Sequence, residues 1–282
     1  MLLADLRTQY HRRICEAIVR IQPGNPTYPN FADKTNKASR EIAWHILGQI
    51  GYTQTDNLHL PGQTAGGRFE EITKEFLENA FKHLKNIRPG EWQYKTGSPI
   101  SEFDQYDHLA RLKKLSETNS DIANLIGNEY IIAPDIVIAR MAVEDTEINL
   151  HEIFIEGDSL ASFTPLRAIN SGRPMLHASI SCKWTLRSDR SQNARSEALN
   201  LIRQRKGKSP HIVVVVAEPL PTRIASLALG TGDIDCVYHF ALHELQKAIT
   251  ELGNEDQLDL LKTLIEGRRL RDISDLPFDL AI

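Results

Sequence analysis

Residues 176–217 have the sequence LHASISCKWTLRSDRSQNARSEALNLIRQRKGKSPHIVVVVA. Over residues 176–184, polar and apolar side chains alternate with a period of two, which predicts a strand with one apolar and one polar face. The apolar run 211–217 is typical of a strand buried on both faces, as in a parallel sheet. Residues 191–206, between the two strands, predict a basic helix. A strand, a helix and a strand in this order indicate an α/β architecture.

The rest of the chain continues this alternation of helices and strands. No internal repeat, low-complexity stretch or linker interrupts residues 1–282, so we expect a single domain. The fold class that follows is α/β, with a central mixed β-sheet flanked by α-helices. Helical spacing predicts further helices over residues 3–21, 36–50, 64–87, 103–115, 233–252 and 255–266, and strand patterns lie at 92–95 and 129–140.

The composition is that of an ordinary globular protein. Of the 282 residues, 41% are apolar and 25% are charged, and the longest uninterrupted apolar run is Ile212–Ala217. A membrane-spanning helix needs roughly 20 apolar residues, so we expect no contact with a membrane. Charged side chains near the N-terminus exclude a secretory signal. The cysteines at 15, 182 and 236 form an odd, widely spaced set, which favours a reducing compartment and predicts a cytoplasmic protein.

Basic charge is concentrated in one segment of an acidic chain. The formal net charge is −4, but eight basic and two acidic residues lie between Lys183 and Lys208 and give that segment a charge of +6. Such a distribution indicates a face that binds phosphate groups, as in proteins that bind nucleic acid. A solvated basic helix face without a ligand explains the same charge equally well.

An aspartate and a lysine stand out because they lie within predicted strands. Asp135 interrupts the apolar run 134–138, where an ionised carboxylate is costly unless a cation compensates its charge. Lys183 ends the strand 176–184, on its polar face. Metal-activated hydrolysis of a phosphodiester needs carboxylates that hold Mg²⁺ and a cation beside the reacting phosphate. Asp135 and Lys183 on neighbouring strands fit these two roles.

Two glutamates become candidates through their positions on predicted helices. In the helix 64–87, a rotation of about 100° per residue places Glu70 within the apolar arc that begins at Phe69, whereas it places Glu71 in solvent. Glu197 lies near the apolar edge of the basic helix. An acid on the inner face of a core helix is a candidate for chemistry. A salt-bridged carboxylate without function remains the alternative for each of them.

Another motif suggests a different class of enzyme. Residues 154–160, FIEGDSL, resemble the nucleophile block of the GDSL esterases. That chemistry needs a histidine base, which the family supplies from an Asp-x-x-His near the C-terminus. The last histidine here is His243, and the residue three positions before it is Phe240. A Gly-Asp turn after a short strand explains the motif more simply.

The candidate residues together match a nuclease pattern. Pro134–Asp135, Ser181–Lys183 and Glu197 resemble the rearranged PD-(D/E)xK motif, in which Ser replaces the acid before Lys and a helix supplies the acid instead. The run CKWTLRSDR, continued by QNARSE up to Glu197, is closely similar to the NgoMIV family of type II restriction endonucleases. The similarity covers nearly the whole chain and includes residues 61–64, 69–70, 211–218, 229–242 and 271–280.

This resemblance implies a restriction-endonuclease-like fold and an activity. The expected reaction is Mg²⁺-dependent hydrolysis of phosphodiester bonds in double-stranded DNA, which leaves 5′-phosphate ends. Two Mg²⁺ ions per site are implied, held directly by Asp135 and the Cys182 carbonyl, with Glu70 and Glu197 nearby or bound through water. The catalytic set that the resemblance implies is Asp135, Lys183, Ser181, Glu70 and Glu197.

The resemblance also implies how the DNA sequence is read. Arg187, Asp189 and Arg190 match the major-groove readers of sites with a CCGG core. The chemistry agrees, because arginine donates two hydrogen bonds to guanine and aspartate accepts one from cytosine. Arg223 and Asp33 match residues that read an outer G·C pair, which implies the site GCCGGC.

The remaining implications concern the minor groove and the partners. Gln63 matches a residue that reaches the minor groove. A palindromic site implies a twofold homodimer, and the family pairs its dimers into homotetramers. A DNA methyltransferase is implied as the functional partner. The alternative from another class is a catalytically silent, sequence-specific DNA-binding protein of the same fold, and the presence of all five catalytic positions argues against it.

Overall fold

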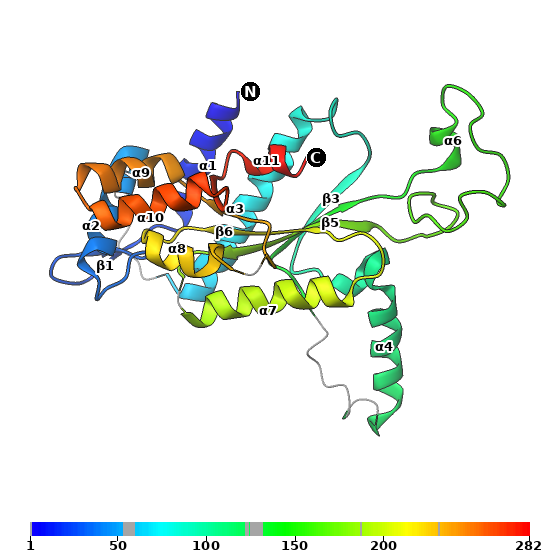
Figure 1. The fold of residues 1–282 in the computed structure, drawn as a ribbon, viewed down its shortest axis with the longest axis horizontal. Coiled ribbons are helices and arrows are strands. Elements are labelled where there is room, and N and C mark those ends of the chain that lie inside the picture. Colours follow the sequence, from blue (N-terminus) through cyan, green and yellow to red (C-terminus); the bar gives the residue numbers. More distant parts are fainter. Residues whose placement is uncertain (1, 53–59, 122–123, 125–131, 187, 231) are drawn as a thin grey trace.

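A six-stranded sheet organises the molecule (Figure 1). The computed structural model describes residues 2–52, 60–121, 124, 132–186, 188–230 and 232–282, without the side chains of residues 188–190. The strand order is β3-β4-β5-β6-β7-β8. β3, β4 and β5 pair antiparallel and β5 to β8 pair parallel, which confirms the predicted mixed sheet. The strands are β3 (Trp92–Thr96), β4 (Ile136–Arg140), β5 (Met175–Lys183), β6 (His211–Val216), β7 (Cys236–His239) and β8 (Leu270–Asp272).

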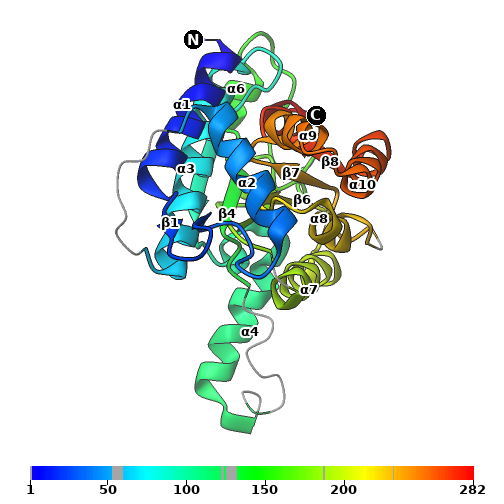
Figure 2. The same ribbon diagram turned by 90° about the vertical axis from the view of Figure 1, so that its left-hand side faces the viewer.

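Helices cover both faces of this sheet. Figure 2 shows α1 and α3 on one side and α7, α8 and α10 on the other. α1 packs against α3 and α2 packs against α9, and a small sheet of β1 (Ile21–Gln22) and β2 (Tyr28–Pro29) lies apart. Within the described part of the chain, no helix is long and apolar enough to cross a membrane. The helices are α1 (Leu3–Ala17), α2 (Lys37–Ile50), α3 (Gly62–His83), α4 (Asp107–Thr118), α6 (Asp145–Ile148), α7 (Ser188–Gln204), α8 (Pro221–Ala228), α9 (Leu242–Glu251), α10 (Glu255–Glu266) and α11 (Leu276–Asp279).

The strand register brings two distant segments together at one edge of the sheet. β4 runs antiparallel to β5, with Ile136 opposite Ile180. Asp135, which precedes β4, therefore lies beside the last residues of β5. β6 runs parallel to β5, with Val216 opposite Lys183, so the chain leaves both strands at the same edge. The carboxyl ends of such strands are where α/β proteins commonly bind ligands.

An aromatic cluster packs around Trp184 at the edge of the sheet where β5 ends. Trp184, directly after β5, is 4% exposed. Its ring centroid lies 5.3 Å from that of Phe69 on α3, 5.4 Å from that of Phe31 and 6.0 Å from that of Phe240. Aromatic rings at such distances bury a large area and prefer defined orientations. The cluster therefore fixes the end of β5 relative to α3 and to the loop that contains Phe31.

Charged groups join the first described helix to the last strand of the sheet. The Arg7 guanidinium on α1 donates to Asp272 on β8 at 2.8 and 2.9 Å. It also donates to Glu244 on α9 at 2.6 and 2.7 Å. The side chain of Asp272 is 1% exposed. Such bidentate, charge-assisted pairs are among the stronger polar contacts in proteins.

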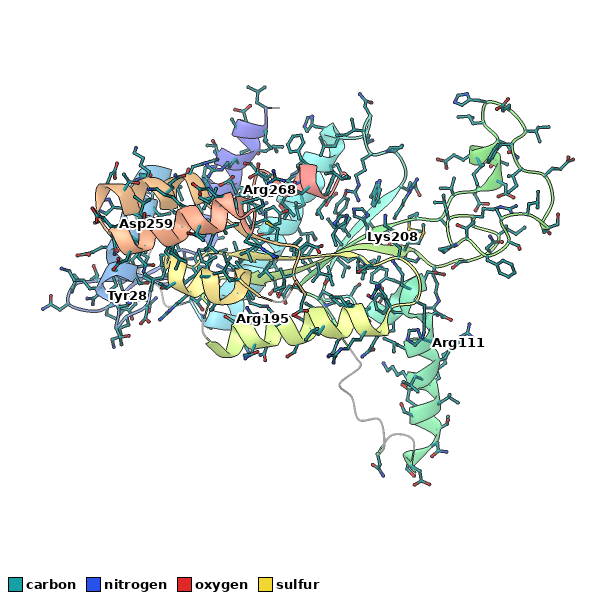
Figure 3. All side chains as sticks on the ribbon, viewed as in Figure 1. Tyr28, Arg111, Arg195, Lys208, Asp259 and Arg268 are labelled. Carbon is teal, nitrogen blue, oxygen red and sulfur yellow. The ribbon has the colours of Figure 1, made fainter. Side chains whose placement is uncertain are left out.

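A long connection between β4 and β5, residues 141–174, extends away from the sheet, and we call it the arm (Figure 1). Arg167 holds the arm together: it pairs with Asp145 at 2.6 Å and is 2% exposed. Figure 3 shows the side chains of the arm standing clear of the sheet. Several large apolar side chains of the arm are exposed, namely Leu150, Ile153, Phe154, Leu160, Phe163 and Ile169.

Several predicted elements differ from the structure. The helix predicted over 233–252 is wrong in its first half, because Cys236–His239 forms β7, which pairs with both β6 and β8 and is buried. The helix predicted over 103–115 begins later, as α4, after two short 3₁₀ turns. The strand predicted over 129–140 begins at Ile136, and the part before residue 132 lies outside the described residues.

Candidate active site

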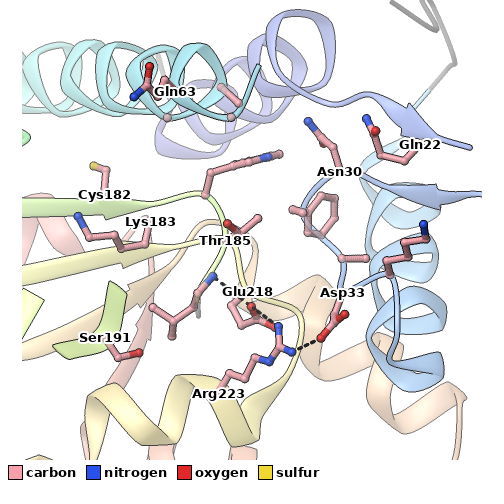
Figure 4. Close-up of a pocket in the computed structure, with 18 of the residues that line it drawn as sticks. Gln22, Asn30, Asp33, Gln63, Cys182, Lys183, Thr185, Ser191, Glu218 and Arg223 are labelled. Carbon is pink, nitrogen blue, oxygen red and sulfur yellow. Dashed lines mark hydrogen bonds and ion pairs between the residues drawn. The ribbon is translucent and has the colours of Figure 1, made fainter. Parts of the chain in front are cut away.

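A cleft of about 1160 Å³ opens at the edge where β5 and β6 end. Its walls come from α3, α8, the start of α7 and the loop around residues 30–35 (Figure 4). Pockets for small ligands commonly measure about 300–1000 Å³, so this cleft has room for part of a larger partner. The predicted site residues among its lining are Asp33, Gln63, Glu70, Asp135, Cys182, Lys183 and Arg223.

The carboxylate of Asp135 lies at the centre of the predicted catalytic set. Its Oδ2 atom accepts hydrogen bonds from Lys183 Nζ at 2.9 Å, from the Cys182 amide at 2.7 Å and from the Ser181 hydroxyl at 3.2 Å. The side chains of Asp135 and Lys183 are only 25% and 17% exposed. These three donors converge on one oxygen of a side chain whose neighbours in the sequence are apolar. The fold thus brings together the acid and the cation that the sequence analysis paired, and their catalytic roles stay predictions.

Glu70 reaches the same site from α3. Burial raises the pKa of the Glu70 carboxyl above its ordinary value, the charge of Asp135 raises it further, and Lys183 lowers it. Glu71, by contrast, is 45% exposed and pairs with Lys74 on the same helix. The helical-face prediction for these two neighbours matches the arrangement, because Glu70 alone lines the cleft.

Glu197 belongs to α7 and approaches the predicted catalytic set from there. Burial raises the pKa of the Glu197 carboxyl, the Lys183 charge lowers it and the Asp135 charge raises it. Glu197 is therefore within electrostatic range of the Asp135–Lys183 pair. Asp135 precedes β4, Glu70 lies on α3 and Glu197 lies on α7, and burial raises the pKa of both glutamates while the Lys183 charge lowers it.

The donor chemistry of this group fits a divalent cation. Raised pKa values for Glu70 and Glu197 reflect burial and the nearby charge of Asp135. A bound cation would favour the ionised forms and relieve this repulsion. Within the described ranges, no three His, Cys, Asp or Glu side chains form a compact group of metal ligands. Mg²⁺ in proteins usually keeps several waters and takes one or two carboxylates, so the residues fit this metal with few direct ligands.

The two residues predicted to read the outer base pair contact each other (Figure 4). Arg223 on α8 forms an ion pair with Asp33 of the opposite loop. Asp33 also accepts a hydrogen bond from the Thr35 amide at 2.8 Å. Hydrogen bonds from Thr35 and Arg223 lower the pKa of the Asp33 carboxyl. Gln63, the predicted minor-groove residue, is exposed in the first turn of α3 and lines the same cleft.

The predicted inner readers fall largely outside the described part of the chain. Arg187 is not among the described residues, and neither are the side chains of Asp189 and Arg190. The backbone at positions 189 and 190 forms the first turn of α7. Ser191 and Asn193, which follow, line the cleft. The N-terminal end of α7 therefore adjoins the cleft, and the reading roles of the three residues stay predictions.

The basic segment 183–208 is spread along α7 and is not confined to the cleft. Arg195 donates a 2.6 Å hydrogen bond to the Ser226 carbonyl and so joins α7 to α8. Lys208 lies beyond the opposite end of α7 (Figure 3). A helix of this length measures about 25 Å, so only its first part can contact a ligand that occupies the cleft.

Glu218 is a residue of the cleft wall that the sequence analysis missed. It follows β6, is 1% exposed and lines the cleft beside Arg223. Burial raises the pKa of its carboxyl to about 7. The sequence could have predicted Glu218 as a site residue. It is an acid directly after the buried strand pattern 211–217, and such a position lies at the edge where parallel strands end.

The esterase-like block, residues 154–160, lies in the arm. The carbonyl groups of Gly157 and Leu160 accept hydrogen bonds from the Arg167 guanidinium at 3.2 and 2.6 Å. Gly157 has a φ of +71°, which suits glycine in a turn. The block therefore forms a turn around Arg167, as its simpler interpretation requires.

Comparisons with known proteins agree with the sequence pattern. The family model described as NgoMIV restriction enzyme matches residues 10–282. The type II restriction enzyme NgoMIV of Neisseria gonorrhoeae is 48% identical over 286 residues, covering 100% of this chain and 99% of that protein. Two solved structures are more distant, both at 14% identity. The restriction endonuclease Bse634I with cognate DNA has a TM-score of 0.41 and covers 86% of this chain and 98% of its own. The PspGI–substrate DNA complex has a TM-score of 0.32 and covers 99% and 92%.

Proposed function

Since the chain belongs to the NgoMIV family of type II restriction enzymes, we propose that it cleaves double-stranded DNA at the palindrome GCCGGC, with Mg²⁺ as cofactor and 5′-phosphate ends as products. As a member of this family the chain is a site-specific endonuclease, which favours the enzyme over a catalytically silent DNA-binding protein. The observation that supports the proposed site best is the Asp135–Lys183 pair, which lines the same cleft as Arg223 and Asp33.

Four groups would hold the metal in this proposal. They are the carboxylates of Asp135, Glu70 and Glu197 and the backbone carbonyl of Cys182, the glutamates acting directly or through water. When bound, Mg²⁺ supplies a water of lowered pKa and neutralises charge on the reacting phosphate. Two ions per site are part of the proposal.

In the proposed site, Lys183 and Ser181 both donate hydrogen bonds to Asp135. The Lys183 ammonium, held 2.9 Å from Asp135 Oδ2, orients the attacking water and stabilises the charge that develops on the phosphoryl oxygens. The Ser181 hydroxyl donates to the same carboxylate oxygen at 3.2 Å and keeps it in place. The hydrogen bonds of Lys183 and Ser181 to Asp135 are both made within the protein itself.

Base recognition in the proposal is divided between two groups of side chains. Arg187, Asp189 and Arg190 would contact the CCGG core in the major groove, because guanine offers two acceptors to arginine and cytosine offers a donor to aspartate. Arg223 and Asp33 would read the outer G·C pair with the same chemistry. Gln63, exposed on the opposite wall of the cleft, would reach the minor groove.

Digestion of a sequenced plasmid tests the proposal directly. We expect fragments whose ends all map to GCCGGC, each end carrying a 5′-phosphate that DNA ligase accepts, and no cleavage after Mg²⁺ is removed with a chelator. Cleavage at every CCGG irrespective of the outer bases would refute the proposed site. Fragments that ligase accepts only after treatment with a kinase would refute the proposed ends.

The proposal extends to assembly and location. We propose a twofold homodimer on the palindrome and a homotetramer built from two dimers. The arm supports the second interface, because Phe154 and Phe163 are 80% and 98% exposed, and exposed apolar surface of this kind marks interaction sites. We also propose that the enzyme acts in the cytoplasm, where its DNA substrate is, together with a DNA methyltransferase that protects the same site.

A further inference from the structure

Glu218 is a buried acid that the proposed chemistry does not use. Its Oε2 atom accepts a hydrogen bond from the Leu186 amide at 3.2 Å, and its Oε1 atom accepts one from the Leu220 amide at 3.2 Å. Arg223 Nη1 lies 3.7 Å from Oε2. Figure 4 shows the resulting chain of contacts from the backbone before α7 through Glu218 and Arg223 to Asp33.

Burial of the Glu218 carboxyl has a cost in free energy. The side chain is 1% exposed, and burial raises the pKa of its carboxyl to about 7. An apolar residue at the end of the run 211–217 would avoid this cost. Above pH 7 the carboxyl is charged, and its two amide hydrogen bonds and the Arg223 charge then offset part of the cost of burial.

The partners of Glu218 are the starting points of the two base-reading elements. Leu186 directly precedes Arg187 and α7, so its amide sets where that segment leaves the sheet. Leu220 is the N-terminal cap residue of α8, which carries Arg223. The carboxylate of Glu218 therefore contacts the backbone before α7, the N-terminal cap of α8 and the guanidinium of Arg223.

We propose that Glu218 is a positioning residue for sequence recognition, which holds the Leu186 backbone, the start of α8 and the Arg223 side chain in one fixed arrangement. The inference rests on the proposed function, in which Arg223 and Asp33 read the outer base pair. Asp33 binds Arg223 from the loop side and Glu218 binds it from the sheet side, so the guanidinium is held between two carboxylates before DNA arrives. Discrimination at the outer pair depends on this orientation, because a bidentate contact to guanine tolerates little displacement.

The test compares cleavage of GCCGGC with cleavage of ACCGGT, which differs only in the outer pair. In Glu218→Gln, the neutral amide no longer attracts Arg223, and we expect the preference for GCCGGC to fall about tenfold or more, which corresponds to the loss of a typical base contact. Glu218→Asp keeps the charge at a shorter reach, and we expect it to recover part of the preference. Glu244→Gln is the matched control, since it also removes a partly buried carboxylate from an arginine pair, away from the cleft.

The outcomes separate the inference from the proposed function. If wild type prefers GCCGGC and both Glu218 variants keep that preference in full, the inference is wrong and the proposed function stands. If the preference falls equally in Glu244→Gln, the effect is general destabilisation and the inference is again wrong. If wild type itself cleaves both sites equally, the proposed recognition site is wrong. Should Glu218→Gln fail to fold, the ratio measured for Glu218→Asp alone decides.

Discussion

At the scale of single residues, the Lys183 ammonium is the group whose removal should separate cleavage from binding. Lys183→Ala takes away the cation that we propose to lie beside the reacting phosphate but leaves the rest of the cleft and Arg223 in place. We expect cleavage to be abolished, while specific binding in Ca²⁺ persists within about tenfold, because most of the affinity comes from other contacts. Gel shifts and plasmid digestion measure the two effects. Lys262→Ala on α10, 50% exposed, is the matched control. Cleavage by Lys183→Ala at the wild-type rate would refute the active-site assignment.

The neighbouring glutamates on α3 give a second test at this scale. Glu70 lies in the cleft near Asp135, whereas Glu71 pairs with Lys74 at the surface. We expect Glu70→Gln to slow cleavage about 100-fold or more, since a candidate metal ligand loses its charge. Glu71→Gln should change the rate less than about twofold, as for an ordinary surface substitution. Single-turnover rates at saturating Mg²⁺ decide, and a larger effect at Glu71 would contradict the assignment.

Glu218 should make the stability of the fold depend on pH. Its pKa is 4.5 in the unfolded reference and about 7 in the folded protein, where burial disfavours the charge. The folded form therefore holds a proton that the unfolded chain releases, so stability falls as the pH rises from 4.5 through 7. The shift corresponds to about 3 kcal/mol. We expect Glu218→Gln to lose this dependence, as measured by urea unfolding at several pH values.

Glu244 should change the stability with pH in the opposite direction, and it serves as a control for the urea-unfolding measurement. Hydrogen bonds and charge from Arg7 outweigh burial and lower the pKa of the Glu244 carboxyl. Its contribution to stability is therefore present above its ordinary pKa and is lost as the pH falls below it. Identical pH profiles for wild type and Glu218→Gln would contradict the assignment of a raised pKa to Glu218.

How well single residues could be predicted depended on whether the signal was local. Asp135 and Lys183 were found because strand alternation and an acid in an apolar run are visible in a few neighbouring letters. Glu70 was separated from Glu71 by helical geometry alone. Glu218 escaped because its partners, Leu186 and Arg223, lie 32 and 5 residues away and meet only through strand pairing and the placement of α8.

At the scale of elements, α7 runs from the cleft to the opposite edge of the sheet. Substitutions at its two ends should therefore have different effects on DNA recognition. We expect Arg187→Ala or Arg190→Ala to cost roughly 1–3 kcal/mol of discrimination at one base pair per half-site. Lys208→Ala, beyond the other end of α7 and away from the cleft, should leave the discrimination between matched and mismatched DNA unchanged. A gel-shift series over matched and single-mismatch duplexes measures both. Equal losses on both duplexes for the arginine variants would refute their role as readers.

The prediction of helices and strands succeeded where one hydrophobic pattern extended over the whole element. The helix predicted over 255–266 coincides with α10, and the strand predicted over 211–217 differs from β6 by one residue. The failure at β7 has a physical cause. Four residues, Cys236–His239, are too few to display alternation, and the apolar spacing of the following helix runs through them. Only pairing with β6 and β8 specifies the strand, and such pairing is invisible in the local sequence.

At the scale of the whole molecule, a tetramer predicts communication between two DNA sites. Binding at one site raises the effective concentration of the second site on the same DNA. We expect a plasmid with two GCCGGC sites to be cut faster than one with a single site, and a short cognate duplex to accelerate the single-site plasmid. Equal rates on both plasmids, together with a dimeric mass by light scattering, would rule out the tetramer.

The arm allows the same prediction to be tested without DNA. Replacing Phe154 and Phe163 by serine removes exposed apolar area from the arm without disturbing the Arg167–Asp145 pair. We expect the double variant to be dimeric by light scattering and to lose the advantage of the two-site plasmid. Ile87→Ser, a 63% exposed residue outside the arm, is the control and should remain tetrameric. A tetramer that survives the double substitution would exclude the arm as its interface.

The contacts of Arg7 can form only late in the synthesis of the chain, because their partners lie 237 and 265 residues further on. Ribosomes make the N-terminal part first, so α1 emerges long before its partners, Glu244 and Asp272. Until β8 leaves the ribosome, Arg7 lacks Asp272, and β7 has an unpaired edge. The half-made chain can already contain Asp135 and Lys183 while β8 is still missing. The contacts that join α1 to α9 and β8 therefore form only after residues 242–272 have left the ribosome.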